Sequence, residues 1–238
     1  MEHVKSQRRR YDSSGRQASA RRNREAVLDA AQRQFLDGGY AATTVAGIAG
    51  EAGVSVETVY KAFGGKSGLV RAIYDRGLTG RGPVSAYQRS DEMRQQETDP
   101  RTIMRNWSVL TTEVASVVTP IRLLIRSAAV IDPEMAELLK QGDDERLTRM
   151  RQHARFLADR GYLRNDVTLD EATDVLWTCS SVEIYELLVL ARGWSHERFV
   201  QFLADFMITS LLPEPKADSA APDGAARPDP RNGNGQNH

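Results

Sequence analysis

Residues 49–66, AGEAGVSVETVYKAFGGK, decide the fold of the N-terminal part of this chain. The stretch has helical character, but Gly53 lies in its middle, and glycine destabilises a helix interior by about 1 kcal/mol relative to alanine. Ser55 follows, and serine is a favoured helix N-cap. The stretch therefore predicts two short helices, about Val45–Ala52 and from Ser55 to Phe63, that meet at a turn at Gly53.

The sequence on either side completes a unit of four helices. Apolar residues at helical spacing predict a first helix that begins at Arg22 and ends at Gly38–Gly39, because glycine accepts the left-handed conformation just past a helix. Thr43 or Thr44 can cap the second helix. A fourth helix begins near Lys66. Two short helices that meet at a glycine, packed on longer ones, have the helix-turn-helix layout.

The second helix of such a unit enters the major groove of DNA, and residues near its N-terminus read the base edges. We expect the reading residues to be Val56, Glu57, Thr58 and Lys61. Tyr60, Lys66 and the threonine that caps the preceding helix, Thr43 or Thr44, can contact phosphates, as can the free backbone N–H groups where the fourth helix begins. The alternative is a plain helical hairpin with an exposed polar face.

The pattern T-V-x-x-I-A-x-x-A-G-V-S-x-x-T-V-Y-x-x-F-x-x-K, at residues 44–66, resembles the N-terminal DNA-binding domain of TetR-family transcriptional regulators. The resemblance covers residues 21–81 and includes all four expected helices. It implies an all-α fold and a homodimer that binds double-stranded DNA at a near-palindromic operator. It also implies a larger C-terminal helical domain that holds a small-molecule effector and mediates dimerisation.

This chain departs from the family pattern at two positions. Glu57 replaces a common glycine, and its carboxylate either accepts a hydrogen bond from a cytosine amino group or points away, stabilised by the positive end of the helix dipole. Gly65 replaces the usual polar cap before Lys66, and glycine is a tolerated cap.

Composition and charge divide the chain into four parts. Residues 1–20 are predicted to be a disordered basic arm, since residues 1–24 hold eight basic and two acidic side chains, a net charge of +6, in a chain whose overall net charge is zero. Residues 21–81 form the DNA-binding domain, and 82–212 the ligand-binding and dimerisation domain. Residues 213–238 hold five of the nine prolines and are predicted to be a disordered tail.

The C-terminal domain reads as further helices. Asp99 caps a helix that opens with Pro100, Pro120 opens another segment, and Asp132–Pro133 starts a long helix to about Arg160. The stretch before Asp99 is weakly patterned and predicts a connection between domains. Two more helices are predicted, one from Thr168 or Asp170 through Ala191 and one that Ser195 caps. Residues 142–151, GDDERLTRMR, predict an exposed helix surface.

Candidate sites in this domain are less well defined by sequence. The residues expected to line an apolar ligand pocket are Met104, Trp107, Leu110, Thr111 and Trp177, each of which also fits an ordinary core position. Arg122 and Arg126 could hold an anionic ligand, although a salt-bridge pair or a solvated face is the simpler reading. Apolar stripes on the last two helices predict a dimer interface that includes Ile184, Leu187, Phe202 and Phe206.

We therefore predict a cytoplasmic, ligand-responsive regulator that acts as a repressor and needs no cofactor, metal or membrane. The four histidines lack metal-ligand spacing, and the chain shows no secretory signal. An alternative is a small-molecule-binding or hydrolytic enzyme, in which the lone Cys179 would need a base and an orienting group. A sequence-indifferent DNA-packaging protein is a third possibility, which the zero net charge disfavours.

Overall fold

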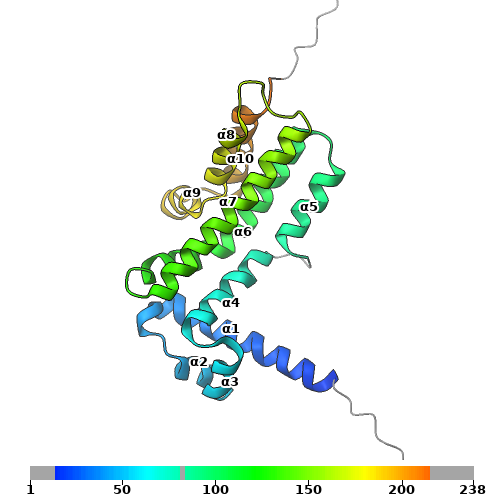
Figure 1. Ribbon diagram of the computed structural model, residues 1–238. Helices are drawn as coiled ribbons and strands as arrows, with labels where there is room; N and C mark the ends of the chain where they lie inside the picture. The colour runs from blue at the N-terminus through cyan, green and yellow to red at the C-terminus, as the bar shows by residue number, and fades with distance from the viewer. Residues whose placement is uncertain (1–13, 81–83, 215–238) are drawn as a thin grey trace, which may run out of the picture.

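In the computed structural model, which describes residues 14–80 and 84–214, the chain forms helices arranged in two parts (Figure 1). The N-terminal head consists of α1 (Ser14–Ala42), α2 (Val45–Ala52), α3 (Val56–Phe63) and α4 (Lys66–Thr79). The body consists of α5 (Ala86–Gln96), α6 (Pro100–Ala128), α7 (Pro133–Asp159), α8 (Leu169–Cys179), α9 (Val182–Tyr185), the π-helix η1 (Glu186–Ala191) and α10 (His196–Leu211). The described residues include no strand, so the all-α prediction is confirmed.

The first helix is longer than the sequence predicted. α1 begins at Ser14, so residues 14–20, which were expected to belong to a disordered arm, are helical, whereas residues 1–13 of that arm lie outside the described residues. The expected break at Gly38–Gly39 is confirmed, because Gly39 has φ 77° and interrupts the helix. After this break the Tyr40 hydroxyl reaches Asp132 of the body.

The sequence predicted a weakly patterned connection between the two parts. The structure corrects this prediction, because residues Ala86–Gln96 of that stretch form helix α5. Its side chains lack a strong apolar stripe, and within it only Ala86 and Ser90 are buried. Polar contacts with the neighbouring helices hold it instead: Arg89 pairs with Glu113 of α6 at 2.6 Å, and Asp91 with Arg149 of α7 at 2.7 Å.

Helix α6 also differs from the prediction, since it runs through Pro120 without ending there. Proline removes one backbone hydrogen bond and disfavours a helix interior, but packing on several sides outweighs this cost. α6 contacts α1, α4, α5, α7, α9 and α10. Within the described residues it is the one helix long and apolar enough to cross a membrane, and half of its apolar window is buried within the fold, as befits a central core helix.

The single helix predicted to run through Ala191 is wrong. α8 ends at Cys179, and Ser181 caps a new start at α9, which passes directly into the six-residue π-helix η1. Serines at two successive positions favour this break because their hydroxyls compete with helical hydrogen bonding and cap helix ends. Of the two caps considered for α8, Thr168 is the one used, in a capping box with Glu171.

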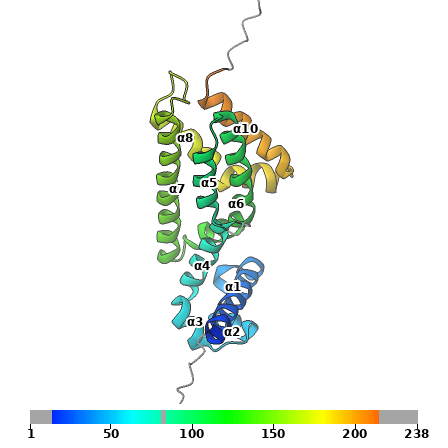
Figure 2. The ribbon, with the colours of Figure 1, turned by 90° about the vertical axis from the view of Figure 1, so that its right-hand side faces the viewer.

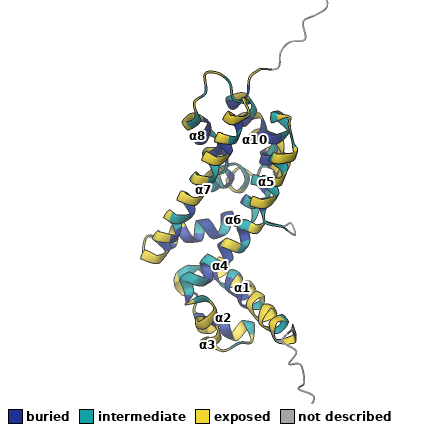
Figure 3. Cartoon of the chain, turned by 45° about the vertical axis from the view of Figure 1, so that its right-hand side comes forward, coloured by how far each residue is buried: buried dark blue, intermediate teal, exposed yellow. Residues whose placement is uncertain are grey.

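Two apolar cores hold the molecule together. One joins the inner faces of α1–α4 to the adjoining ends of α6 and α7, and it includes Phe35, Ile73, Ile125 and Met135. The other fills the body between α6, α7, α8 and α10. Figure 3 shows the buried residues continuing along α6 and into α4, where the two parts meet. Helix α4 thus belongs to the head by sequence and reaches the body by packing (Figure 2).

Candidate DNA-binding surface and ligand cavity

The turn between α2 and α3 has the geometry that the sequence predicted. Gly53 adopts φ 68°, a left-handed conformation that favours glycine. The Ser55 hydroxyl accepts a hydrogen bond from the backbone N–H of Thr58 at 3.1 Å and so caps α3. The same Ser55 hydroxyl shares a 2.8 Å hydrogen bond with the hydroxyl of Thr58.

The structure distinguishes between the two threonines proposed as caps of α2. Thr44 is exposed, and its hydroxyl accepts from the backbone N–H of Gly47 at 3.0 Å. Thr43 is buried, and its hydroxyl donates to the carbonyl oxygens of Gln34 and Gly39 at 2.9 and 2.8 Å. Thr43 therefore has no hydroxyl available for a phosphate, which corrects its place among the candidate DNA contacts.

Helix α3 presents its polar-aromatic face outward. Val59 is fully buried and anchors the helix to the head, whereas Tyr60 is 53% exposed. The remaining candidates are exposed as well: Val56, Glu57, Thr58 and Lys61. Glu57 lies in the first turn of α3, where the helix dipole favours a negative charge. The outward face of α3 is thus free to enter a groove.

Lys66 lies at the first position of α4, at the seam between head and body. Its ammonium group is 4.3 Å from the centre of the Tyr40 ring. The preceding Gly65 has φ 136°, a conformation that a residue with a side chain rarely adopts. The departure from the polar cap is therefore a backbone requirement of this turn.

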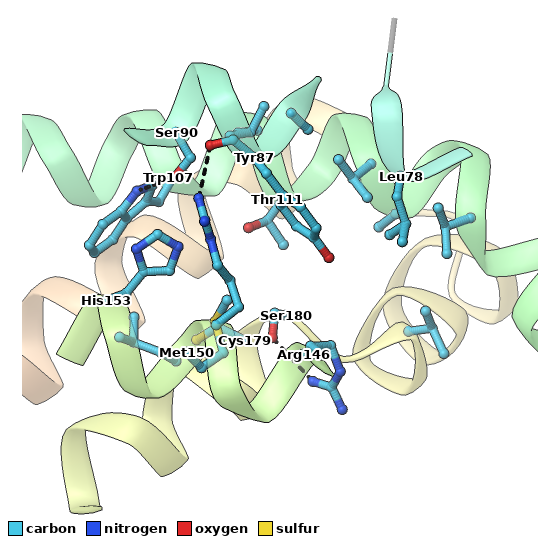
Figure 4. Close-up of a pocket in the computed structure, with 18 of the residues that line it drawn as sticks. Leu78, Tyr87, Ser90, Trp107, Thr111, Arg146, Met150, His153, Cys179 and Ser180 are labelled. Atoms are coloured by element: carbon cyan, nitrogen blue, oxygen red, sulfur yellow. Dashed lines mark hydrogen bonds between the residues drawn. The ribbon is translucent and has the colours of Figure 1, made fainter. Parts of the chain in front are cut away.

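The body contains a mostly apolar cavity of about 130 Å³ (Figure 4). It is enclosed by side chains of α4, α5, α6, α7, α8, α9 and α10 and by the α8–α9 turn. Trp107, Leu110 and Thr111 of α6, which the sequence proposed for a pocket, line it. Tyr74 and Leu78 of α4 line it too, so the head's last helix forms part of the cavity wall.

Two of the proposed pocket residues lie elsewhere. Met104 is fully buried in the body core. Trp177 does not line the cavity, and Arg146 packs on it instead. The Arg146 guanidinium lies 4.4 Å from the centre of the Trp177 ring and donates to the Trp177 carbonyl oxygen at 2.5 Å. Arg146 therefore lines the cavity, whereas Trp177, which the sequence analysis proposed, does not.

Three polar residues of the cavity lining come from α7, and two of them, Arg146 and Arg149, lie in residues 142–151, which the sequence analysis interpreted as an exposed surface. Arg146, Arg149 and His153 all line the cavity (Figure 4). Arg149 is held by Asp91 at 2.7 Å and by the carbonyl oxygen of Tyr87 at 2.8 Å. Spacings of three and four residues place these side chains on one helix face, a signal that the mixed charges of the segment obscured.

Arg122 meets the other helices at the end of the cavity nearest the head. Its guanidinium donates to Asp143 at 2.7 Å and lies 5.7 Å from the Tyr74 ring centre. Arg126, four residues later, donates to Glu186 at 2.9 Å. Each arginine is thus in a salt bridge, which agrees with the simpler of the two readings of this pair.

Four aromatic and aliphatic side chains are exposed on η1 and α10: Leu187, Leu190, Phe202 and Phe206. Leu187 is 58% and Phe206 41% exposed, and the rings of Phe202 and Phe206 stack at 6.2 Å. Ile184, the fourth proposed interface residue, is half-buried and packs on the body core instead. The exposed set is an unpartnered apolar face of the single chain.

Together, the helix-turn-helix head and the cavity-bearing body define a two-part helical DNA-binding protein. The family model for bacterial regulatory proteins of the tetR family matches residues 27–73, which include the whole helix-turn-helix. The head is therefore similar to the DNA-binding domain of tetR-family regulatory proteins over residues 27–73. None of the curated proteins matches this chain in sequence.

Solved structures share the fold over most of the chain. SmeT in its complex with triclosan has a TM-score of 0.64 at 22% identity, covering 88% of this chain and 99% of SmeT. NalD of Pseudomonas aeruginosa, the secondary repressor of the MexAB-OprM multidrug efflux pump, has a TM-score of 0.63 at 19% identity over 82% of this chain and 99% of NalD. A Saccharomonospora viridis regulator in complex with choline has a TM-score of 0.59 at 19% identity over 83% of this chain and 99% of its own.

Proposed function

We propose that the protein is a homodimeric repressor that leaves its operator when a small, mostly apolar molecule enters the cavity of the body. DNA binding is assigned to residues 21–81, and ligand binding and dimerisation to residues 82–212. The structural relatives support this direction of control, since NalD is a repressor and SmeT binds triclosan.

At the operator, α3 reads the major groove. Val56, Glu57, Thr58 and Lys61 face or flank the bases, while Thr44, Tyr60 and Lys66 hold the phosphates on either side. Two heads related by the dimer axis would contact a near-palindromic site, one half-site each. The exposed face of η1 and α10 supplies the dimer contact in this proposal, because its apolar side chains need a partner to leave water.

One observation carries the control mechanism: α4 begins at Lys66, the proposed phosphate contact, and has Tyr74 in the cavity wall. Eight residues of helix span roughly 12 Å, so a ligand that displaces Tyr74 acts on the same rigid element that positions Lys66. A differential binding free energy of about 1–3 kcal/mol is enough to change operator occupancy 5–150-fold.

The space for such movement is small at the junction of α4, α6 and α7. A Cβ atom added at Gly142 of α7 would lie 2.8 Å from Arg122 Nη1 and 3.1 Å from the Tyr74 hydroxyl. Three helices therefore touch at one point beside the cavity. A shift of Tyr74 must displace Arg122 or α7. In this proposal the junction therefore transmits a change in the cavity to the position of α4.

The enzyme alternative has little support at the thiol. Cys179 lines the cavity, but burial raises its pKa to about 12, so it is a neutral thiol at physiological pH and a poor nucleophile. Incubation with a panel of esterase substrates would test this alternative directly.

The proposed function is tested in two steps. Genomic DNA fragments are selected on the immobilised protein and sequenced, which identifies the operator. Apolar compounds that quench tryptophan fluorescence are then added to the operator complex. Release of the DNA by a compound that binds the cavity supports the proposal, whereas tight cavity binding by several such compounds with unchanged operator affinity contradicts the coupling.

A further inference from the structure

His153 lines the cavity, and one nitrogen of its buried ring is unsatisfied. The side chain is only 5% exposed, and its Nδ1 has no hydrogen-bond partner among the residues that the structure describes. Burial, with the charges of Arg149 and Arg94, lowers the pKa of His153 well below its ordinary value, so the ring is neutral. Buried polar atoms in native proteins nearly always have a partner, so an unpaired one in a cavity wall marks a place for a ligand atom.

Two neighbours of His153 are held by hydrogen bonds to other groups. Trp107 lies against the imidazole, with ring centres 4.4 Å apart, and its indole N–H donates to the Ser90 hydroxyl at 3.1 Å. The Nη atoms of Arg149 are occupied by Asp91 and the Tyr87 carbonyl, whereas its buried Nε has no partner among the described residues. Figure 4 shows the His153 ring beside Trp107, with Met150 from the same helix close by. In the described part of the chain, two polar atoms of this wall therefore lack a partner, the His153 Nδ1 beside an aromatic surface and the donor Nε–H of Arg149.

We propose that the effector is a small aromatic molecule with a hydroxyl group, which hydrogen-bonds to His153 while its ring lies against Trp107. This inference rests on the proposed function and names the chemical class that the cavity recognises. A hydroxyl can both donate and accept, so it satisfies the imidazole nitrogen in either tautomer, whereas a carbonyl oxygen fits only one.

The arginines around the cavity repel a cation, and their existing salt bridges compete with an anion. Three of the four charged lining residues are arginines, and the fourth, Glu183, is exposed and 3.8 Å from Arg126. A cation would therefore meet like charge. An anion would meet an excess of positive charge, since Arg122 and Arg146 share Asp143 and Arg149 shares Asp91 with Arg94, but it would have to compete with these salt bridges for the guanidinium groups. Burying an unpaired charge is costly, so a neutral ligand is preferred.

The size of the cavity sets the size of the ligand. An engineered apolar cavity of about 150 Å³ in another protein holds benzene, so about 130 Å³ accepts roughly one ring without rearrangement. Met150 lines the cavity, and methionine side chains adapt readily, which makes room for a second fused ring. A bicyclic phenol is thus a suitable probe.

The test compares 2-naphthol with 2-methylnaphthalene, which replaces the hydroxyl by a methyl group of similar size. Affinities for the full-length protein are measured by quenching of tryptophan fluorescence and by calorimetry. We expect 2-naphthol to bind at least about tenfold tighter, because a buried hydrogen bond discriminates to that extent. In His153→Leu the two probes should bind equally. His196→Leu, a matched change at an exposed histidine outside the cavity lining, should keep the preference.

The wild-type comparison needs no variant, so the inference can fail even if His153→Leu does not fold. Equal affinities, tighter binding of 2-naphthoate or of phenyltrimethylammonium, no binding of any probe, or a preference that survives in folded His153→Leu would each overturn it. Operator release is recorded separately. If 2-naphthol binds preferentially but the operator DNA is not released, the ligand class is supported and the proposed function is contradicted. If the operator DNA is released but neither probe is preferred, the proposed function is supported and the ligand class is contradicted.

Discussion

The hydroxyl of Tyr40 donates a 2.5 Å hydrogen bond to the Asp132 carboxylate, 92 residues away. Tyr40 follows the break in α1, and Asp132 caps α7, so this bond ties the head to the body. Burial and the neighbouring carboxylate raise the pKa of Tyr40, while the hydrogen bond from Tyr40 lowers the pKa of Asp132. Because Lys66 lies over the Tyr40 ring, the same contact supports a proposed phosphate-binding residue.

Replacing Tyr40 by phenylalanine tests this link. The ring and its contacts with Phe35 and Lys66 remain, and only the hydrogen bond is lost. We expect the free energy of unfolding to fall by about 1 kcal/mol, measured by urea denaturation. Tyr60→Phe is the control, because the exposed Tyr60 should contribute less than about 0.5 kcal/mol. Equal effects of the two changes would show that the Tyr40–Asp132 bond contributes no net stability.

Gly68→Ala should damage the head. A Cβ atom at Gly68 would lie 1.7 Å from the carbonyl oxygen of Phe63, so α4 must move away from α3. We expect a loss of more than about 2 kcal/mol in unfolding free energy, in line with severe overpacking. Gly50→Ala in α2 is the matched control, since nothing lies within 4 Å of its added Cβ and alanine favours a helix by up to about 1 kcal/mol. A Gly68→Ala protein of unchanged thermal stability would contradict this close approach of α4 to the end of α3.

Two kinds of DNA contact should be separable by their salt dependence. Lys66→Ala should weaken binding to every sequence and reduce the slope of log affinity against log salt by roughly one unit per subunit. Val56→Ala or Thr58→Ala should instead change which base is preferred, by about 1–3 kcal/mol for each lost contact. Affinities for the selected operator and its single-base variants, measured from about 50 to 200 mM salt, distinguish the two. An unchanged slope in Lys66→Ala would show that Lys66 does not contact a phosphate.

The exposed apolar face should control assembly. Leu187→Asp on η1 or Phe206→Asp on α10 should convert the proposed dimer to monomers, because a charge cannot be buried unpaired at the centre of an interface. Leu36→Asp, at an exposed apolar position in the head, should remain dimeric. Light scattering at micromolar concentration gives the mass. A monomeric wild-type protein would falsify the proposed interface.

His153 should make stability depend on pH. Its native pKa lies below the unfolded value of 6.5, so the unfolded state takes up the additional proton as the pH falls through 6.5. The contribution of neutral His153 to the free energy of unfolding is therefore fully present above pH 6.5. Below pH 6.5 the free energy of unfolding declines by at most about 1.4 kcal/mol per pH unit, until the pH reaches the lowered native pKa.

Denaturation of wild type, His153→Gln and His196→Gln between about pH 7 and 5 measures this contribution. We expect the decline to be shallower in His153→Gln, which cannot take up the proton, and unchanged in His196→Gln. The same decline in all three proteins would show that the burial of neutral His153 is not its cause.

The local sequence determined the head. Gly53 supplies a left-handed turn, Thr44 and Ser55 cap the helices on either side, and the apolar spacing through Val59 places the inner face. Each of these signals acts over a few residues, so the helix-turn-helix and the outward residues of α3 could be predicted from sequence. The choice between Thr43 and Thr44 could not, because only packing against α1 decided which hydroxyl is buried.

The cavity was decided by tertiary structure. α5 has little apolar pattern of its own and is held by charged partners 24 and 58 residues away in sequence. The inward arginines of α7 and His153 look like parts of a solvated helix until Asp91, Asp143 and Trp107 are brought beside them. Trp177 looks like a pocket residue until Arg146 covers its ring. Sequence periodicity reports which face of a helix is apolar, whereas the polarity of a cavity depends on which distant side chains neutralise each buried charge, and only the folded chain brings those side chains together.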